Sequence, residues 1–76
     1  MAKKNSSDGS VYKVIELVGT SSKGFDDAAQ NAVVAASKTL KDIRVAEVTK
    51  LDIKVEKGKV VFRAKLKLSF KYHQNM

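Results

Sequence analysis

Residues 60–72 alternate between apolar and polar side chains. One parity carries Val60, Phe62, Ala64, Leu66, Leu68, Phe70 and Tyr72. The other parity is basic or polar apart from Val61. A period of two predicts a β-strand with one buried and one solvated face, about 40 Å long, against a usual length of about five or six residues. A chain of 76 residues is too small to cover such a strand alone, so the pattern predicts partner subunits.

The segment before this strand predicts its pairing. Lys57 and Gly58 have the composition of a two-residue hairpin turn, with glycine taking the positive φ that such turns require. Folding the chain there places three apolar pairs on one face, Val55 with Val60, Ile53 with Phe62 and Leu51 with Ala64. The opposite face pairs Glu56 with Lys59 and Asp52 with Arg63, both attractively. A slip of one residue would disrupt both faces, so a single register is predicted.

Residues 11–18 predict a strand that is apolar on both faces. Val11, Ile15 and Leu17 lie on one parity, and Tyr12, Val14 and Val18 lie on the other. A strand of this kind is normally covered on both sides. In so small a chain, we expect the second cover to be another subunit.

Residues 19–24, GTSSKG, predict a turn into a helix. Ser21 or Ser22 is the expected N-cap, and Asp26 and Asp27 fall in the first turn, where carboxylates favour the helix dipole. One helical face then carries Phe25, Ala28, Ala29, Ala32, Val33, Ala36 and Leu40. Lysines 38 and 41 have the charge that favours its C-terminal end. Because the apolar face is mostly alanine, a sheet can approach the helix closely.

The period of two returns over residues 43–55 with a fault in the middle. Odd-numbered positions are apolar at both ends of the segment, but Glu47 and Thr49 interrupt them, while Ala46 and Val48 are apolar on the even side. A bulge or sharp bend near Glu47 would explain this change of phase. The predicted order is β-α-β-β, an α+β fold in which a three-stranded antiparallel sheet curls around one helix.

Size and composition also favour an assembly. A domain of about this size buries only about 60% of the surface that its unfolded chain exposes. The chain has no cysteine and one histidine, so neither disulfides nor a zinc cluster can add stability. Oligomerisation is the remaining common way to stabilise so small a core. We expect a flexible polar leader over residues 1–10, one domain over residues 11–72 and a short tail over residues 73–76.

Charge and hydropathy bear on partners and location. A formal net charge of +7 raises the alternative of a basic nucleic-acid-binding module. The phenylalanines fall on core positions and tryptophan is absent, so a stacking platform for bases is not evident, and a solvated basic face is favoured. No apolar run approaches the roughly 18 residues of a membrane span. The first residues also lack the apolar core of a secretory signal, so we expect a cytoplasmic protein without membrane contact.

No catalytic constellation is present in the sequence. No serine has a histidine and an acid patterned near it, and no glycine-rich phosphate loop follows a strand. His73, the one histidine, is expected on the surface near the end of the chain. We therefore expect no enzymatic activity.

The motifs of residues 11–72 resemble the dodecin family. The most specific are GTS at residues 19–21 and AEV at residues 46–48, combined with an alanine-rich helix and a last strand ending in KLSFKY. The resemblance implies a hollow shell of twelve subunits, a dodecamer, in which each sheet curls around its helix. It also implies non-catalytic storage or protective binding of small ligands, in many members flavins held in pairs between subunits.

Two positions depart from the flavin-binding pattern of that family. A tryptophan that stacks on the flavin ring precedes the AEV-like segment in such members, and Val45 occupies that position here. A glutamine that contacts the flavin corresponds to Arg63, which donates hydrogen bonds but cannot accept them. Because stacking on an aromatic ring is worth about 1–3 kcal/mol, flavin binding is not expected. The resemblance points instead to the subgroup that lacks this tryptophan, some members of which bind calcium.

The candidate ligand residues also have structural interpretations. Arg63 could contact an anion or ligand at a subunit junction, or could pair with Asp52. Glu47 and Asp42 are the candidate metal ligands, but either could be a structural carboxylate. No contiguous acidic loop supplies the six to eight oxygens that calcium takes, so a site would have to form between subunits or from main-chain oxygens.

The favoured function is a non-catalytic, dodecin-like homo-oligomer that sequesters a small ligand or cation, with the flavin pocket lost. No cofactor is certain, and calcium is the candidate ion. A flavin-storage dodecin and a basic nucleic-acid-binding module are the alternatives.

Overall fold

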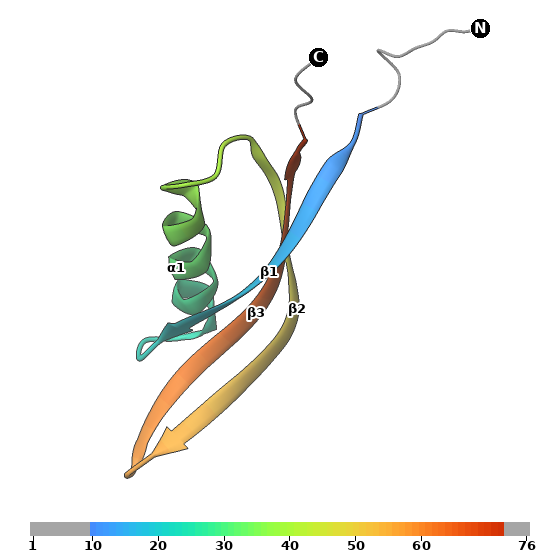
Figure 1. The fold of residues 1–76 in the computed structure, drawn as a ribbon. Helices are drawn as coiled ribbons and strands as arrows, with labels where there is room; N and C mark the ends of the chain where they lie inside the picture. The colour runs from blue at the N-terminus through green and yellow to red at the C-terminus, as the bar shows by residue number, and fades with distance from the viewer. Residues whose placement is uncertain (1–9, 73–76) are drawn as a thin grey trace, which may run out of the picture.

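The structure, a computed structural model, describes residues 10–72 and confirms the predicted β-α-β-β order. The four elements are β1 (Tyr12–Ser21), α1 (Phe25–Ser37), β2 (Ile43–Glu56) and β3 (Lys59–Lys71). The predicted leader, apart from residue 10, and the predicted tail with His73 lie outside the described residues. Helix α1 lies against one face of a long, twisted sheet (Figure 1), which gives the chain principal extents of 61, 21 and 15 Å.

The sheet is antiparallel, with β3 in the centre and the strand order β1-β3-β2. The predicted hairpin register is confirmed in full, because Val55 pairs with Val60 and Asp52 pairs with Arg63. Lys57 and Gly58 have φ angles of 47° and 78°, the left-handed values expected for a primed two-residue turn. The turn and both faces of the hairpin therefore agree on one register.

Strand β2 has two register shifts where the sequence predicted one near Glu47. One lies between Ile43 and Val45, and the other lies between Val48 and Lys50. Glu47 itself is in register, opposite Lys67. The first shift moves Ala46 and Val48 onto the face that carries the helix, and the second returns β2 to its original phase. The fault in the pattern is therefore a pair of bulges that flank Glu47.

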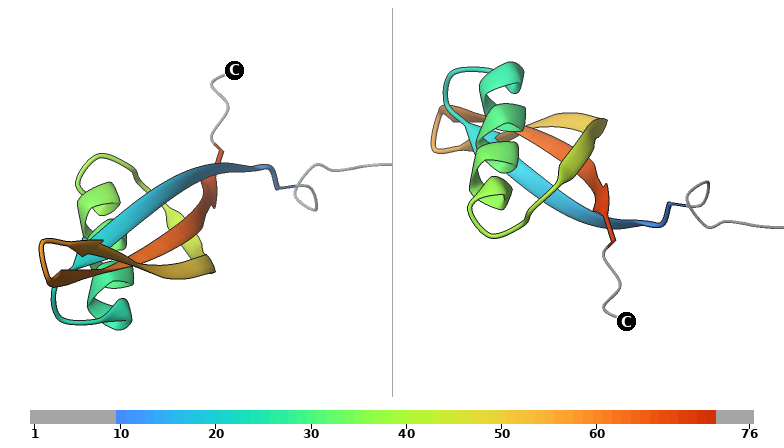
Figure 2. Two further views of the ribbon diagram at one scale, coloured as in Figure 1. Left: turned by 90° about the horizontal axis from the view of Figure 1, so that it is seen from below. Right: turned by 90° about the horizontal axis from the view of Figure 1, so that it is seen from above.

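The core lies where α1 crosses the centre of the sheet. The buried residues are Ala28, Ala32 and Ala36 of the helix and Ala64, Leu66 and Leu68 of β3. The alanines let the helix approach so closely that a Cβ atom at Gly19 would lie 2.0 Å from the main-chain oxygen of Ala28. Two further views show the twisted strands crossing α1 (Figure 2). Close approach of an alanine face to the sheet is thus confirmed.

The ends of α1 differ from the predicted ones. Gly24 is the N-cap, and no side chain caps the helix. The hydroxyl of Ser21 instead donates to Asp27 (2.6 Å) and accepts from the main-chain N–H of Lys23 (2.9 Å). These bonds hold the turn that precedes the helix. They leave the free main-chain N–H groups of the first helical turn without a side-chain cap. The helix ends at Ser37, with Lys38 as its C-cap and no basic residue in its last turn. Within residues 10–72, no helix is long and apolar enough to cross a membrane.

Candidate functional site

The face of the sheet turned away from α1, here called the outer face, carries Val45 and Arg63. No described helix covers it. Val45 is opposite Ser69 and 57% exposed, whereas Arg63 lies further along β3, opposite Asp52. Six positions of β3 separate the two rows, which corresponds to roughly 20 Å. Val45 and Arg63 of one protomer therefore do not meet, and a pocket containing both would need a second subunit.

Arg63 makes the cross-strand ion pair that the sequence offered as its structural role. Its Nε donates to Asp52 Oδ1 at 2.7 Å, and its Nη2 donates to Asp52 Oδ2 at 3.0 Å. These hydrogen bonds, together with the charge of Arg63, hold the pKa of Asp52 below its ordinary value of 3.8. The same bonds raise the pKa of Arg63. A two-point contact of this kind holds the guanidinium against the sheet.

The structure does not bring Glu47 and Asp42 together within one protomer. Glu47 lies on the outer face, opposite Lys67. Asp42 lies before β2 with a φ of 61°, and its main-chain oxygen accepts from the N–H of Lys71 at 3.2 Å. Among residues 10–72, no group of three or more histidine, cysteine, aspartate or glutamate side chains could hold a metal ion. A metal site that uses Glu47 or Asp42 stays a prediction that requires more than one subunit.

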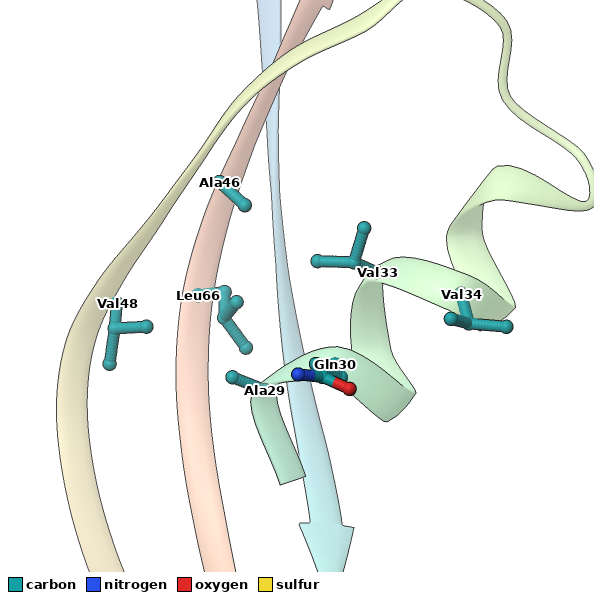
Figure 3. Close-up of a pocket in the computed structure, with 7 residues that line it drawn as sticks. All are labelled: Ala29, Gln30, Val33, Val34, Ala46, Val48 and Leu66. Carbon is teal, nitrogen blue, oxygen red and sulfur yellow. The ribbon is translucent and has the colours of Figure 1, made fainter. Parts of the chain in front are cut away.

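An apolar groove between α1 and β2 was not predicted from the sequence (Figure 3). Its volume is about 420 Å³, and its lining residues are Ala29, Gln30, Val33, Val34, Ala46, Val48 and Leu66. Gln30 is the one polar side chain in this lining. The signal that could have revealed the groove was Val34, an apolar residue outside the predicted helical stripe, which is 58% exposed.

The β2–β3 hairpin continues beyond α1 as an arm, here defined as residues 51–62 (Figure 1). The side of the arm that continues the helix-bearing face is apolar and open. Its most exposed members are Leu51, Ile53, Val55 and Val60, between 47% and 72% exposed. Val14 and Val18 are also exposed, on the outer face of β1, where the sequence predicted a second cover. Exposed aliphatic surface on this scale is typical of contacts between subunits.

The phenylalanine side chains give little support for nucleic-acid stacking. Phe62 lies on the helix-bearing face, with its ring 5.1 Å from that of Phe25 in an edge-to-face contact. Phe70 shares this face, opposite Ile43. Phenylalanine rings therefore pack beside the helix and its flanks rather than forming a platform beside the lysines of the outer face.

Known proteins are similar to this chain over nearly its whole described length. A family model described as Dodecin matches residues 11–73. Calcium dodecin of Mycobacterium tuberculosis is 48% identical over 63 residues, which are 82% of this chain and 89% of that protein. The structure of dodecin from Streptomyces coelicolor has a TM-score of 0.81 at 40% identity and covers 87% of this chain and 96% of its own. The structure of the M. tuberculosis calcium dodecin, described as calcium chelating, has a TM-score of 0.78 at 43% identity, with the same coverage.

Proposed function

The chain belongs to the dodecin family, and from that membership we propose that it forms a closed shell that sequesters a small ligand or a divalent cation without catalysis. The open apolar surface of the protomer carries this proposal. The groove, the arm and the valines of β1 leave large aliphatic side chains in solvent, whereas the buried core of the described residues consists of four alanines and two leucines. Copies of the same chain are the partners that fit, since a small core gains most from association.

The altered flavin positions support a ligand other than flavin. Val45 offers no ring for stacking, a contribution worth about 1–3 kcal/mol. Arg63 donates to both carboxylate oxygens of Asp52, so contact with a flavin would compete with an existing ion pair. The competing function is flavin storage, which requires that a neighbouring subunit replace both contacts.

A divalent cation is the ligand that the family relationship favours. The relative from M. tuberculosis is named calcium dodecin. Glu47 presents an exposed carboxylate on the outer face. In a symmetric shell, a residue next to a rotation axis meets its own copies, and Glu47 is proposed to lie next to such an axis. Carboxylates brought so near to each other repel unless a cation or a proton lies between them. Glu47, with Asp42 as the second candidate, is therefore the proposed cation ligand at a junction between subunits.

Thermal unfolding of the assembled protein tests this function. Calcium should raise the Tm of the native protein over that in EDTA, because a ligand that binds only the folded state stabilises it by about 2.7 kcal/mol at a hundred times its Kd. Glu47→Gln should remove the increase. Glu16→Gln is the matched control, since Glu16 faces Lys67 from the other side of the same row, and it should retain the increase.

Two results would contradict the proposed function. A Tm of the native protein that is identical with EDTA and with calcium would rule out the cation. Strong quenching of riboflavin fluorescence by the native protein would show that the flavin site is intact in spite of Val45 and Arg63. In that case the protein would be a flavin store.

A further inference from the structure

The two strands of the arm have an entirely apolar side. Where the arm continues the helix-bearing face, its residues are Leu51, Ile53, Val55, Val60 and Phe62. The charged residues of these strands alternate with them and lie on the outer face. From Leu51 to the turn, the apolar side is about 20 Å long. Helix α1 has 13 residues and about the same length. A surface as long as one helix would therefore cover the arm.

The groove between α1 and β2 is a second uncovered part of the same apolar side (Figure 3). Ala46 and Val48 line it from β2, and the same strand then runs on into the arm. The arm of a protomer thus leads away from that protomer's own groove (Figure 1). A second copy of the chain is the molecule that brings an arm to the groove.

The spacing of side chains along α1 matches the spacing along the arm. Asp26, Gln30 and Val34 recur at four-residue steps on one side of the helix, and the last two line the groove. One such step is about 6 Å long, and residues on one side of a strand are about 6.8 Å apart. With the tip of the arm towards the start of α1, Val55 comes opposite Gln30 and Ile53 comes opposite Val34.

Charges at the ends of the two surfaces favour this direction. Lys57 at the tip of the arm and Asp26 in the first turn of α1 are both exposed. Neither forms an ion pair among residues 10–72. Asp26 lines a depression of about 390 Å³ at the start of the helix, and the matched spacing brings Lys57 of a second copy there. The opposite direction would place Lys57 beside Lys38, the C-cap of the helix, where like charges repel.

We propose that the arm of one copy docks in the groove between α1 and β2 of a second copy, with Lys57 paired with Asp26 and Ile53 packed on Val34. This contact rests on the proposed shell and names two surfaces that meet in it. Because the two surfaces differ, each copy provides one arm and receives another. Contacts of this head-to-tail kind satisfy every copy once they close around a rotation axis.

Reversal of the paired charges tests the contact, with light scattering over a series of protein concentrations. Lys57→Glu and Asp26→Lys should each raise the protomer concentration at half-assembly by about tenfold or more, because repulsion replaces attraction at contact distance. The double variant restores opposite charges and should assemble at nearly the native concentration. Lys59→Glu is the matched control, since Lys59 lies beside the turn on the outer face, opposite Glu56. Combined with Asp26→Lys, it should give no recovery.

A charge in the groove tests the apolar part of the contact. Val34→Lys should lower the solution mass to that of a small species, because docking would bury its ammonium without a partner. Ala35→Lys is the matched control, since Ala35 is the next helical residue, is also exposed and does not line the groove. It should keep the native mass. Circular dichroism confirms that each variant keeps its fold.

The possible results separate this contact from the shell itself. A native protein that is monomeric at micromolar concentration contradicts the proposed shell and this contact together. A native assembly whose mass survives Val34→Lys, or whose charge reversals show no recovery in the double variant, overturns this contact alone. Release of one apolar small molecule per protomer when the native assembly is denatured also overturns it, because that molecule would then occupy the groove.

Discussion

The two halves of the β2–β3 hairpin have similar apolar residues on the same face but opposite environments. Near the centre of the sheet, Leu66 and Leu68 are at most 1% exposed beneath α1. In the arm, Ile53 and Val55 are 47% and 72% exposed. The helix has 13 residues and is about 20 Å long, whereas the longest strand has 14 residues and is about 46 Å long.

Because the strands are longer than the helix, one protomer has both a contact within itself and a surface for contact with another molecule. In the covered half, the protomer's own helix buries Leu66 and Leu68, and only the groove at its edge stays open. The arm has the same apolar pattern without a cover, so its packing has to be completed by another molecule. Shell assembly, as proposed, would close the second half in the way that α1 closes the first.

The largest expected effect comes from a charge in the arm. Val55→Lys should abolish the large assembly at micromolar protein, because each contact would bury an ammonium without a partner at a cost above about 2 kcal/mol. Light scattering should show the mass fall from near twelve times that of the 8.3 kDa chain to a small species. Lys54→Gln, on the opposite face of the same arm, should keep the large species. A native protein that is already a monomer would contradict both the comparison and the proposed shell.

A smaller effect is expected in the covered half, at Gly19. Gly19→Ala places a Cβ atom 2.0 Å from the Ala28 oxygen, so the helix has to shift. The free energy of unfolding should fall by about 1–3 kcal/mol or more. Gly24→Ala is the control, because a Cβ there meets nothing within 4 Å, and it should cost at most about 1 kcal/mol as an N-cap change. Denaturant unfolding at one fixed protomer concentration measures both, and equal losses would contradict the close approach.

The smallest expected effect concerns the outer-face ion pair where the arm begins. The folded-state pKa of Asp52 is lowered below 3.8, so its contribution to stability is present above pH 3.8 and disappears as the pH falls through the lower folded value. Asp52→Asn should flatten the acid limb of the stability curve below pH 4 and leave the slope at neutral pH unchanged. Glu16→Gln, which changes a carboxylate in another row of the same face, should keep that limb. Thermal unfolding from pH 2 to 7 makes the comparison, and an unchanged acid limb in Asp52→Asn would contradict it.

Several features could be predicted because independent constraints coincided. The hairpin register followed from the turn at Lys57 and Gly58 together with the charge and apolar pairs on the two faces. The ion pair of Arg63 with Asp52 followed from that register alone. The alanine face of α1 predicted a close approach to the sheet, which Gly19 then permits. In each case a short stretch of chain contains all the residues that determine the outcome.

Other features depended on contacts between residues distant in the chain. A change of phase near Glu47 was visible, but its division into two bulges depends on how Ala46 and Val48 meet the face that carries α1. The N-cap differs for a local reason, because Ser21 forms hydrogen bonds with Asp27 and Lys23 and Gly24 takes the N-cap position. The groove beside Val34 exists only once the strands and the helix are placed. Periodicity specifies which side of an element is apolar, whereas three-dimensional packing determines which part of that side remains uncovered.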